Sequence, residues 1–281
     1  MNELITADGT RLHLQPWPAA AAPPRGIVLI VHGLGEHIGR YAHVAACLNA
    51  QGWAVAGHDQ RGHGQSGGAR GAMPEADSLA ADLALVIDTV RRPGLPLVLL
   101  GHSMGGLLAA RFVAEELSAQ PAAWSRPVDA LVLSSPALDP GMSGFQKGLL
   151  ALLGGLAPNL ALGNGLRPEW VSRDPAVVAA YVADPLNHDR VTPRLVRFIV
   201  YGGALALARS PLWRTPTLLL WAGADRCVAP RGRAAFAAAA PGEVVEAQVF
   251  APLFHEIFNE PERAEVLSRL GDWLERRFPR G

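Results

Sequence analysis

The sequence has few cysteines, no net charge and no visible secretory signal. It contains only two cysteines in 281 residues, Cys47 and Cys227, and neither belongs to a Cys-x-x-Cys pair or lies near a histidine at metal-ligand spacing. Two cysteines cannot form a disulfide framework for a chain of this length. We therefore expect two reduced thiols, which suits a cytoplasmic protein.

Net charge is also absent. The 25 basic and 25 acidic residues cancel, and Lys147 is the only lysine. A basic surface for nucleic acid is therefore not indicated, and we expect no nucleic-acid partner. The first residues lack a basic segment followed by an apolar one, so no secretory signal is visible. The expected location is the cytoplasm, with peripheral membrane association as an open alternative.

The uncharged segment 148–165 is the stretch that most invites comparison with a membrane-spanning helix. It is interrupted by Pro158, by two asparagines and by five glycines. A transmembrane helix needs about 20 predominantly apolar residues. We therefore do not expect this segment to span a membrane.

Short apolar runs alternate with longer amphipathic segments along most of the chain. The runs are too short for lone helices, which is typical of strands buried on both faces. The expected strands are 12–15, in a hairpin with the Asp8-Gly9 pair, and 26–31, 53–56, 95–100, 129–134, 216–221 and 244–250; the expected helices are 41–51, 78–90 (capped by Ser78), 104–117, 231–239 and 261–277 (with Pro261 first). This alternation predicts the α/β class, with a mostly parallel sheet flanked by helices.

The alternation stops between about residues 139 and 210, where several prolines interrupt the chain and no strong buried strand is visible. We interpret this region as a helical cap inserted after the sixth strand. The predicted organisation is thus an α/β core of residues 1–138 and 211–281 with a cap of residues 139–210.

A Gly-x-Ser-x-Gly motif centred on Ser103 lies between an expected strand and an expected helix. Such a sharp turn strains the serine backbone and raises its hydroxyl above the sheet. Glycine is required two residues to either side because larger side chains would collide there. The motif alone is weak in a chain with 30 glycines, and the alternative is a tight packing turn. The strand before it and the helix after it predict Ser103 as a nucleophile.

A serine nucleophile needs a basic histidine and an orienting carboxylate. In this fold the chain order is Ser, then Asp or Glu, then His. Only His188 and His255 lie beyond Ser103, and His188 falls in the expected cap. We predict His255 as the base, since it follows the last strand. Asp225 follows the preceding strand and is the predicted acid.

An oxyanion needs two donors, for which we predict the backbone N–H groups of Met104 and Leu34. The glycines beside Leu34 let that backbone approach a substrate. A metal alternative rests on His58, Asp59 and His63, whose spacing does not match a zinc pattern. No metal or cofactor is therefore expected.

With these residues in place, the chain resembles the monoacylglycerol lipase and lysophospholipase branch of the α/β hydrolases over nearly its whole length. The matching motifs are His32–His37 with Gly39–Tyr41, Asp59–Ser66, Gly101–Gly106, Ser135–Ala137, Asp184–Leu186, Gly223–Asp225 and His255–Glu260. The resemblance implies a triad of Ser103, Asp225 and His255, a mobile cap, and cleavage of single-chain esters such as monoacylglycerols or lysophospholipids.

The cap contains a helical stripe of apolar residues, namely Phe145, Leu149, Leu152, Leu153 and Leu156. The stripe either packs on the body of the protein, or lines an acyl channel or contacts a lipid surface. Phe145, Leu149 and Leu153 are the candidates for acyl binding, and transient membrane contact through the cap is an open alternative. Glu36 and Arg40 either meet a polar head group or form a local ion pair.

The expected function is hydrolysis of a monoacylglycerol or lysophospholipid to a fatty acid and an alcohol, through an acyl-enzyme on Ser103. The alternative is a carboxylesterase or thioesterase for a small acyl substrate. Dehalogenases and epoxide hydrolases of this fold carry Asp at the nucleophile position, which disfavours them. A non-catalytic binding protein is disfavoured because no triad residue is missing.

Overall fold

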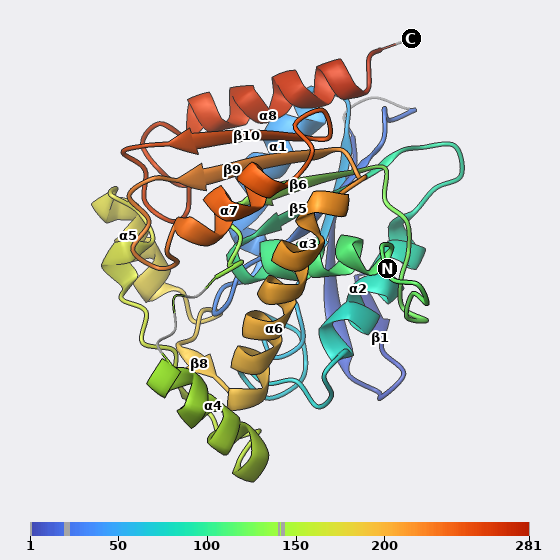
Figure 1. Cartoon of the computed structure of the whole chain (residues 1–281). Coiled ribbons are helices and arrows are strands. Elements are labelled where there is room, and N and C mark those ends of the chain that lie inside the picture. Colours follow the sequence, from blue (N-terminus) through green and yellow to red (C-terminus); the bar gives the residue numbers. More distant parts are fainter. Residues whose placement is uncertain (1, 20–22, 140, 142–143, 281) are drawn as a thin grey trace.

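The protein is built on an eight-stranded sheet with a layer of helices on each face (Figure 1). This computed structural model describes residues 2–19, 23–139, 141 and 144–280, without the side chains of residues 145–147 and 149. This architecture confirms the α/β class predicted from the sequence, with a mostly parallel sheet flanked by helices.

The first two pairings in the sheet are antiparallel, and all later ones are parallel. Its strands are β1 (Glu3–Ile5), β2 (Arg11–Trp17), β3 (Ile27–Val31), β4 (Ala54–His58), β5 (Leu97–His102), β6 (Ala130–Ser134), β9 (Thr217–Ala222) and β10 (Val245–Phe250). They are ordered β1-β2-β4-β3-β5-β6-β9-β10. From β4 onward all neighbours pair in parallel, so the carboxyl ends of β3, β5, β9 and β10 meet at one edge. That edge is where sheets of this kind carry their sites.

Each face of the sheet has its own hydrophobic core. One core holds α1 (Ala42–Ala50) and α8 (Arg263–Arg277), and the other holds α2 (Ser78–Val90), α3 (Ser103–Glu115), α6 (Pro193–Arg209) and α7 (Arg231–Ala239). Within β3, alternate residues enter opposite cores: Leu29 packs with α2 and α3, whereas Ile30 packs with α1 and α8. The continuous apolar run of this strand therefore fits burial on both faces.

Two helix starts differ from the sequence prediction. The last helix begins at Arg263 rather than at Pro261, because the chain turns at Glu260, whose carbonyl accepts the Arg263 N–H at 3.0 Å. Ser78 is the first residue of α2 rather than its cap, and its hydroxyl oxygen accepts the Glu75 N–H at 3.0 Å.

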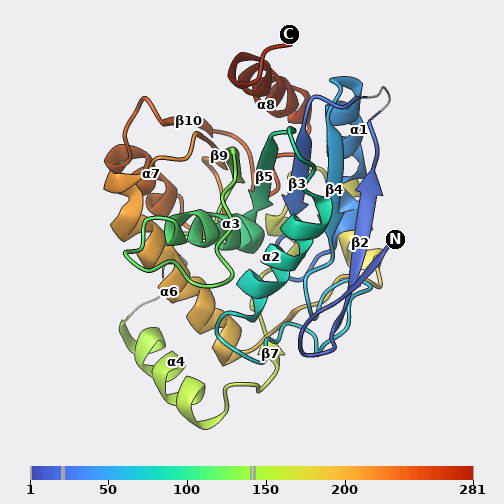
Figure 2. The same ribbon diagram turned by 90° about the vertical axis from the view of Figure 1, so that its right-hand side faces the viewer.

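The region between β6 and β9 is largely helical, as predicted. It contains α4 (Gly144–Leu156), β7 (Leu162–Gly163), a 3-10 turn at Pro168–Trp170, α5 (Pro175–Ala183), β8 (Arg190–Val191), α6 and a second 3-10 turn at Ser210–Leu212. Figure 2 shows α4 projecting from one end of the molecule beside α6. The division into a core and a cap of residues 139–210 stays a prediction.

One helical stretch among the described residues, Pro193–Leu212, has the length and hydropathy of a membrane span. A buried helix of a protein core can have the same length and hydropathy, so these two properties alone do not indicate a membrane span. The stretch packs against α3, with Leu195, Ile199 and Ala206 buried in the core on that side of the sheet.

Three buried histidines lie at or just beyond the ends of β3 and β4. Burial lowers the pKa of His58 to about 3, that of His63 well below its ordinary value, and that of His32 as well. All three are therefore neutral in the folded protein near pH 7. In the unfolded chain each histidine titrates near 6.5.

Acidification should therefore destabilise the fold. Below pH 6.5 the unfolded chain binds more protons than the folded one, so this part of the stability is complete above that pH and is lost as the pH falls toward 3. For His58 the loss at pH 5 is about 2 kcal/mol. Urea unfolding at pH 7 and pH 5 measures it.

The matched comparison is His58→Gln against His13→Gln, which changes a half-buried histidine on β2. The loss between pH 7 and pH 5 should shrink in the first variant and stay the same in the second. An identical loss in both variants would show that His58 does not cause the acid sensitivity.

Candidate active site

Ser103 lies on the sharp turn between β5 and α3, and its backbone is in the left-handed region with φ +52°. A Cβ atom on Gly101 would lie 2.5 Å from the Gly105 carbonyl oxygen. A Cβ atom on Gly105 would lie 2.2 Å from the carbonyl oxygens of Val31 and His32. Backbone contacts therefore require glycine at positions 101 and 105. Ser103 is strained, because it is a non-glycine residue at positive φ.

The structure brings together the three residues predicted as a triad. The Ser103 Oγ lies 2.8 Å from His255 Nε2, and His255 Nδ1 lies 2.7 Å from Asp225 Oδ2. Because an ionised carboxylate only accepts hydrogen bonds, Nδ1 carries the proton and Nε2 is left to accept the serine hydroxyl proton. The geometry is that of a nucleophile, a base and an orienting acid.

The carboxylate of Asp225 is fully buried and ionised. Burial raises its pKa, but His255, Arg233 and the Val228 N–H together lower the pKa well below its ordinary value. Its second oxygen accepts the backbone N–H groups of Cys227 at 2.8 Å and of Val228 at 2.9 Å. The acid is thereby held in one orientation toward the histidine.

The two predicted oxyanion donors belong to segments that meet beside Ser103. A Cβ atom on Gly33 would lie 3.1 Å from the Ser103 Cβ, so the loop after β3 passes close to the serine. Within the described residues, the Leu34 N–H donates to no protein group. Met104 is in the first turn of α3, where an N–H has no intrahelical acceptor. Both N–H groups are thus free for a ligand.

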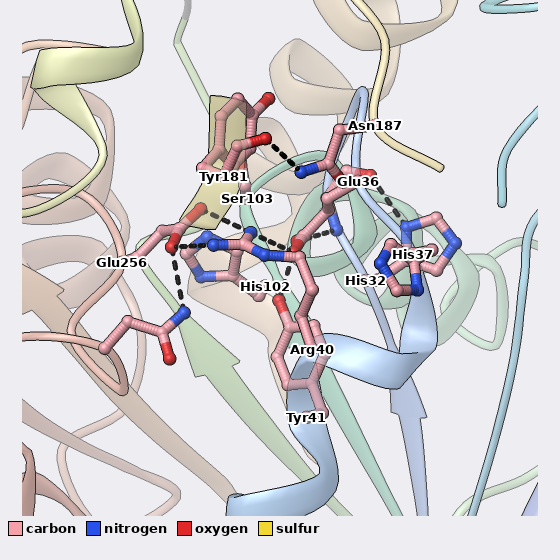
Figure 3. Close-up of polar contacts among 12 residues, drawn as sticks. His32, Glu36, His37, Arg40, Tyr41, His102, Ser103, Tyr181, Asn187 and Glu256 are labelled. Atoms are coloured by element: carbon pink, nitrogen blue, oxygen red, sulfur yellow. Dashed lines mark hydrogen bonds and ion pairs between the residues drawn. The ribbon is translucent and has the colours of Figure 1, made fainter. Parts of the chain in front are cut away.

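Glu36 and Arg40 belong to a buried ionic network that joins two loops of the site. Glu36 Oε1 accepts the Gly33 N–H at 2.6 Å and the Tyr41 hydroxyl at 2.7 Å. Arg40 bonds to Glu36 at 2.7 Å and to both oxygens of Glu256 at 2.7 and 2.6 Å. Figure 3 shows Arg40 lying between the two glutamates. Of the two roles left open for Glu36 and Arg40, the structure contains the local ion pair.

The network also reaches the predicted cap. The ring of Tyr181 on α5 lies 4.8 Å from the Arg40 guanidinium carbon, a cation–π contact. Burial raises the pKa of Glu36, but Arg40 and its other partners lower the pKa to about 2. Two carboxylates, one arginine and one aromatic ring therefore connect the loop after β3, the residue after His255 and α5.

A cavity of about 250 Å³ opens at Ser103. Its core side includes Leu34, Glu36 and His255. The predicted cap contributes both apolar and polar lining residues, namely Leu166, Val171, Tyr181 and Val182 together with Asn164, Arg167, Asp184, Asn187, His188 and Asp189. Leu153 is not among its lining residues. The side chains of Phe145 and Leu149 lie outside the described part of the structure.

Two residues for which the sequence predicts no role at the site lie against the triad. Arg233 of α7 bonds to Asp225 at 2.7 Å with both side chains fully buried. The Cys227 sulfur lies within 4.8 Å of ligand atoms of Asp225 and His255, a grouping that could hold a metal ion. However, Asp225 and His255 already bond to each other. No local sequence pattern marks Arg233 or Cys227. The grouping with His255 arises only in the fold, because His255 is 28 positions from Cys227 and 30 positions from Asp225 in the sequence.

We expect Glu36→Ala to slow the reaction of Ser103 with a fluorophosphonate by about tenfold to a hundredfold, because the Gly33 N–H loses its acceptor and the Leu34 donor loses its fixed position. Glu36→Gln keeps an oxygen at that place and should lose less. Labelling rates of folded protein measure both effects. Equal rates for Glu36→Ala and the unmodified chain would remove this carboxylate from the support of the oxyanion loop.

The chain is similar to known proteins over nearly its full length. A family model described as serine aminopeptidase, S33, matches residues 22–262. A monoacylglycerol lipase from Mycolicibacterium smegmatis is 35% identical over 95% of this chain and 93% of its own length. An uncharacterized abhydrolase domain-containing protein from Dictyostelium discoideum is 31% identical over 99% of this chain, which spans only 29% of that protein.

Among solved structures, the monoacylglycerol lipase of Paleococcus ferrophilus superposes with a TM-score of 0.84 at 32% identity, covering 95% of this chain and 99% of that one. The resemblance read from the sequence motifs is thereby confirmed. The chain belongs to the serine aminopeptidase S33 family of the α/β-hydrolase superfamily, and within that superfamily it is similar to the monoacylglycerol lipases.

Proposed function

We propose that this chain cleaves monoacylglycerols or related single-chain lipid esters into a fatty acid and an alcohol. Its similarity to monoacylglycerol lipases within the α/β-hydrolase superfamily indicates a carboxylic ester hydrolase. The observation that carries the proposal is the continuous hydrogen-bonded line from Ser103 through His255 to Asp225, at 2.8 and 2.7 Å, in a relative of monoacylglycerol lipases.

The proposed reaction is acyl transfer through two tetrahedral intermediates. His255 Nε2 takes the proton of Ser103 as Oγ attacks the ester carbonyl carbon, and the N–H groups of Leu34 and Met104 receive the oxyanion. His255 then gives the proton to the departing alcohol oxygen. Water, deprotonated by the same nitrogen, attacks the carbonyl carbon of the acyl-enzyme. The bond from that carbon to Ser103 Oγ then breaks, His255 returns the proton to Oγ, and the fatty acid is released.

A small ester is a second candidate substrate, and the volume of the cavity favours it. About 250 Å³ is below the roughly 300–1,000 Å³ of pockets that enclose drug-sized ligands. A long acyl chain would need the predicted cap to move outward, whereas a short acyl group would not. The two candidates therefore differ in chain-length preference.

We expect Ser103→Ala to lower turnover of monoacylglycerols by about 10⁴ or more, because the nucleophile is lost while the binding surface remains. Fatty acid release is measured for glycerol monoesters from short to long chains. A Ser103-dependent optimum at a long chain supports the lipid substrate, and an optimum at the shortest chain supports the small ester. Undiminished release by Ser103→Ala would refute the proposed nucleophile.

We also propose that α4 contacts a lipid surface. Leu152 and Leu156 on this helix are 58% and 77% exposed, and Leu160 just after it is 48% exposed. Clustered apolar side chains on a projecting helix are typical of peripheral membrane contacts. Such a contact would be reversible and would bring the cavity close to the lipid that holds the substrate.

Replacing Leu152 and Leu156 together by Asp should therefore reduce hydrolysis of a monoacylglycerol presented in vesicles and leave hydrolysis of dissolved p-nitrophenyl butyrate unchanged. A fall of about tenfold is expected, since two apolar anchors are lost. Val249→Asp, at a half-exposed position on β10 at the other end of the molecule, is the control (Figure 1). Parallel loss on both substrates would argue for a folding defect rather than a lipid contact.

A further inference from the structure

Arg233 is a fully buried cation that the proposed reaction does not use. It lies in the first turn of α7, and both its side chain and that of Asp225 are 0% exposed. Its Nη1 lies 2.7 Å from Asp225 Oδ2, and its Nη2 donates to the Val228 carbonyl oxygen. Within the described residues its Nε has no hydrogen-bond partner. Burying an arginine that has an unpaired N–H donor costs folding free energy. Stability alone therefore does not explain why Arg233 lies here.

The position of the contact supplies a reason. The oxygen that Arg233 holds, Oδ2, is the same oxygen that accepts the His255 Nδ1–H at 2.7 Å. The carboxylate therefore receives four donors, two on each oxygen. Because arginine stays protonated in proteins, the pair Asp225–Arg233 has no net charge where His255 meets it.

We propose that Arg233 is a positioning residue of the triad: it fixes the Asp225 carboxylate and shares its charge, so that His255 stays neutral and able to accept a proton at lower pH. The inference rests on the proposed triad. An unshared carboxylate stabilises an imidazolium ion more strongly than a shared one, since the arginine repels that ion. Arg233 thus extends the range of activity toward acid.

The other ionisable groups around the histidine do not supply this effect. Burial lowers the pKa of His102, whose ring centroid lies 4.9 Å from that of His255, to about 4, so it is neutral over the range of interest. Burial raises the pKa of the Cys227 thiol, which therefore stays protonated. Glu256 is paired with Arg40. In the part of the chain that the structure describes, Arg233 is the arginine that pairs with the carboxylate of the proposed acid.

The test is the pH dependence of kcat/KM for p-nitrophenyl butyrate, with active sites counted by fluorophosphonate titration. Arg233→Met should move the acid limb of the profile up by about one pH unit. Arg233→Lys keeps the charge and should leave the limb near its original position. Arg231→Met removes a solvent-exposed arginine of the same helix, bonded to Asp139 at 2.6 Å, and should leave the profile unchanged.

If Arg233 has a purely structural role, Arg233→Met should have fewer fluorophosphonate-reactive sites or a lower melting temperature, with an unshifted acid limb of kcat/KM. This result overturns the inference. If Arg233→Met does not fold, Arg233→Gln gives the same comparison with a neutral donor in place of the cation. An unmodified chain that neither reacts with the fluorophosphonate nor cleaves the ester overturns the proposed function itself. A reactive chain with an unshifted limb overturns the role of Arg233 alone.

Discussion

The close approach of backbone to backbone at the turn from β5 into α3 is the constraint on which the rest of the site depends. Gly101 and Gly105 have no room for a Cβ atom, and Gly105 lies directly on the carbonyl oxygens that end β3. The same contact therefore fixes the helix start, the strained backbone of Ser103 and the beginning of the loop that carries Leu34. The strain, of the order of 1–3 kcal/mol, persists because β5 is buried along its whole length and is paired on both sides.

Buried charges connect the loops that the sheet alone leaves unconnected. Arg40 joins Glu36, in the loop after β3, to Glu256, in the loop after β10. Arg233 joins α7 to the loop after β9 through Asp225. A desolvated ion pair is weak evidence for stability, but removing one partner leaves an uncompensated buried charge. These pairs therefore resist any arrangement in which the loops separate.

The sequence was most informative where the structure is local. The run at 26–31 and the motif around Ser103 carry their own patterns, and chain order left only two histidines as candidates for the base. Arg233 and the Arg40–Glu256 pair could not be found this way. Arg40 meets Glu256 across 216 positions, and both arginines belong to a chain in which arginine is the usual cation. The sequence predicts the apolar stripe of α4, but it does not predict whether that stripe faces the body of the protein or a lipid surface.

The segments between β6 and β9 differ in how firmly they are joined to the sheet, and this bears on how a lipid would enter. Near His255, Val171 accepts the Glu256 N–H at 2.9 Å, and Arg173 bonds to the fully buried Glu260 at 2.5 Å. On the other side of the cavity, His188 donates its N–H to Gly35 at 2.9 Å. The cap residues that line the cavity are thus held at two places by the loops that carry the proposed base and oxyanion donor. By contrast, α4 packs mainly on α6 and projects from one end of the molecule. Since no described residue of α4 lines the cavity, movement of α4 would leave in place both these contacts and the hydrogen bonds that set the triad.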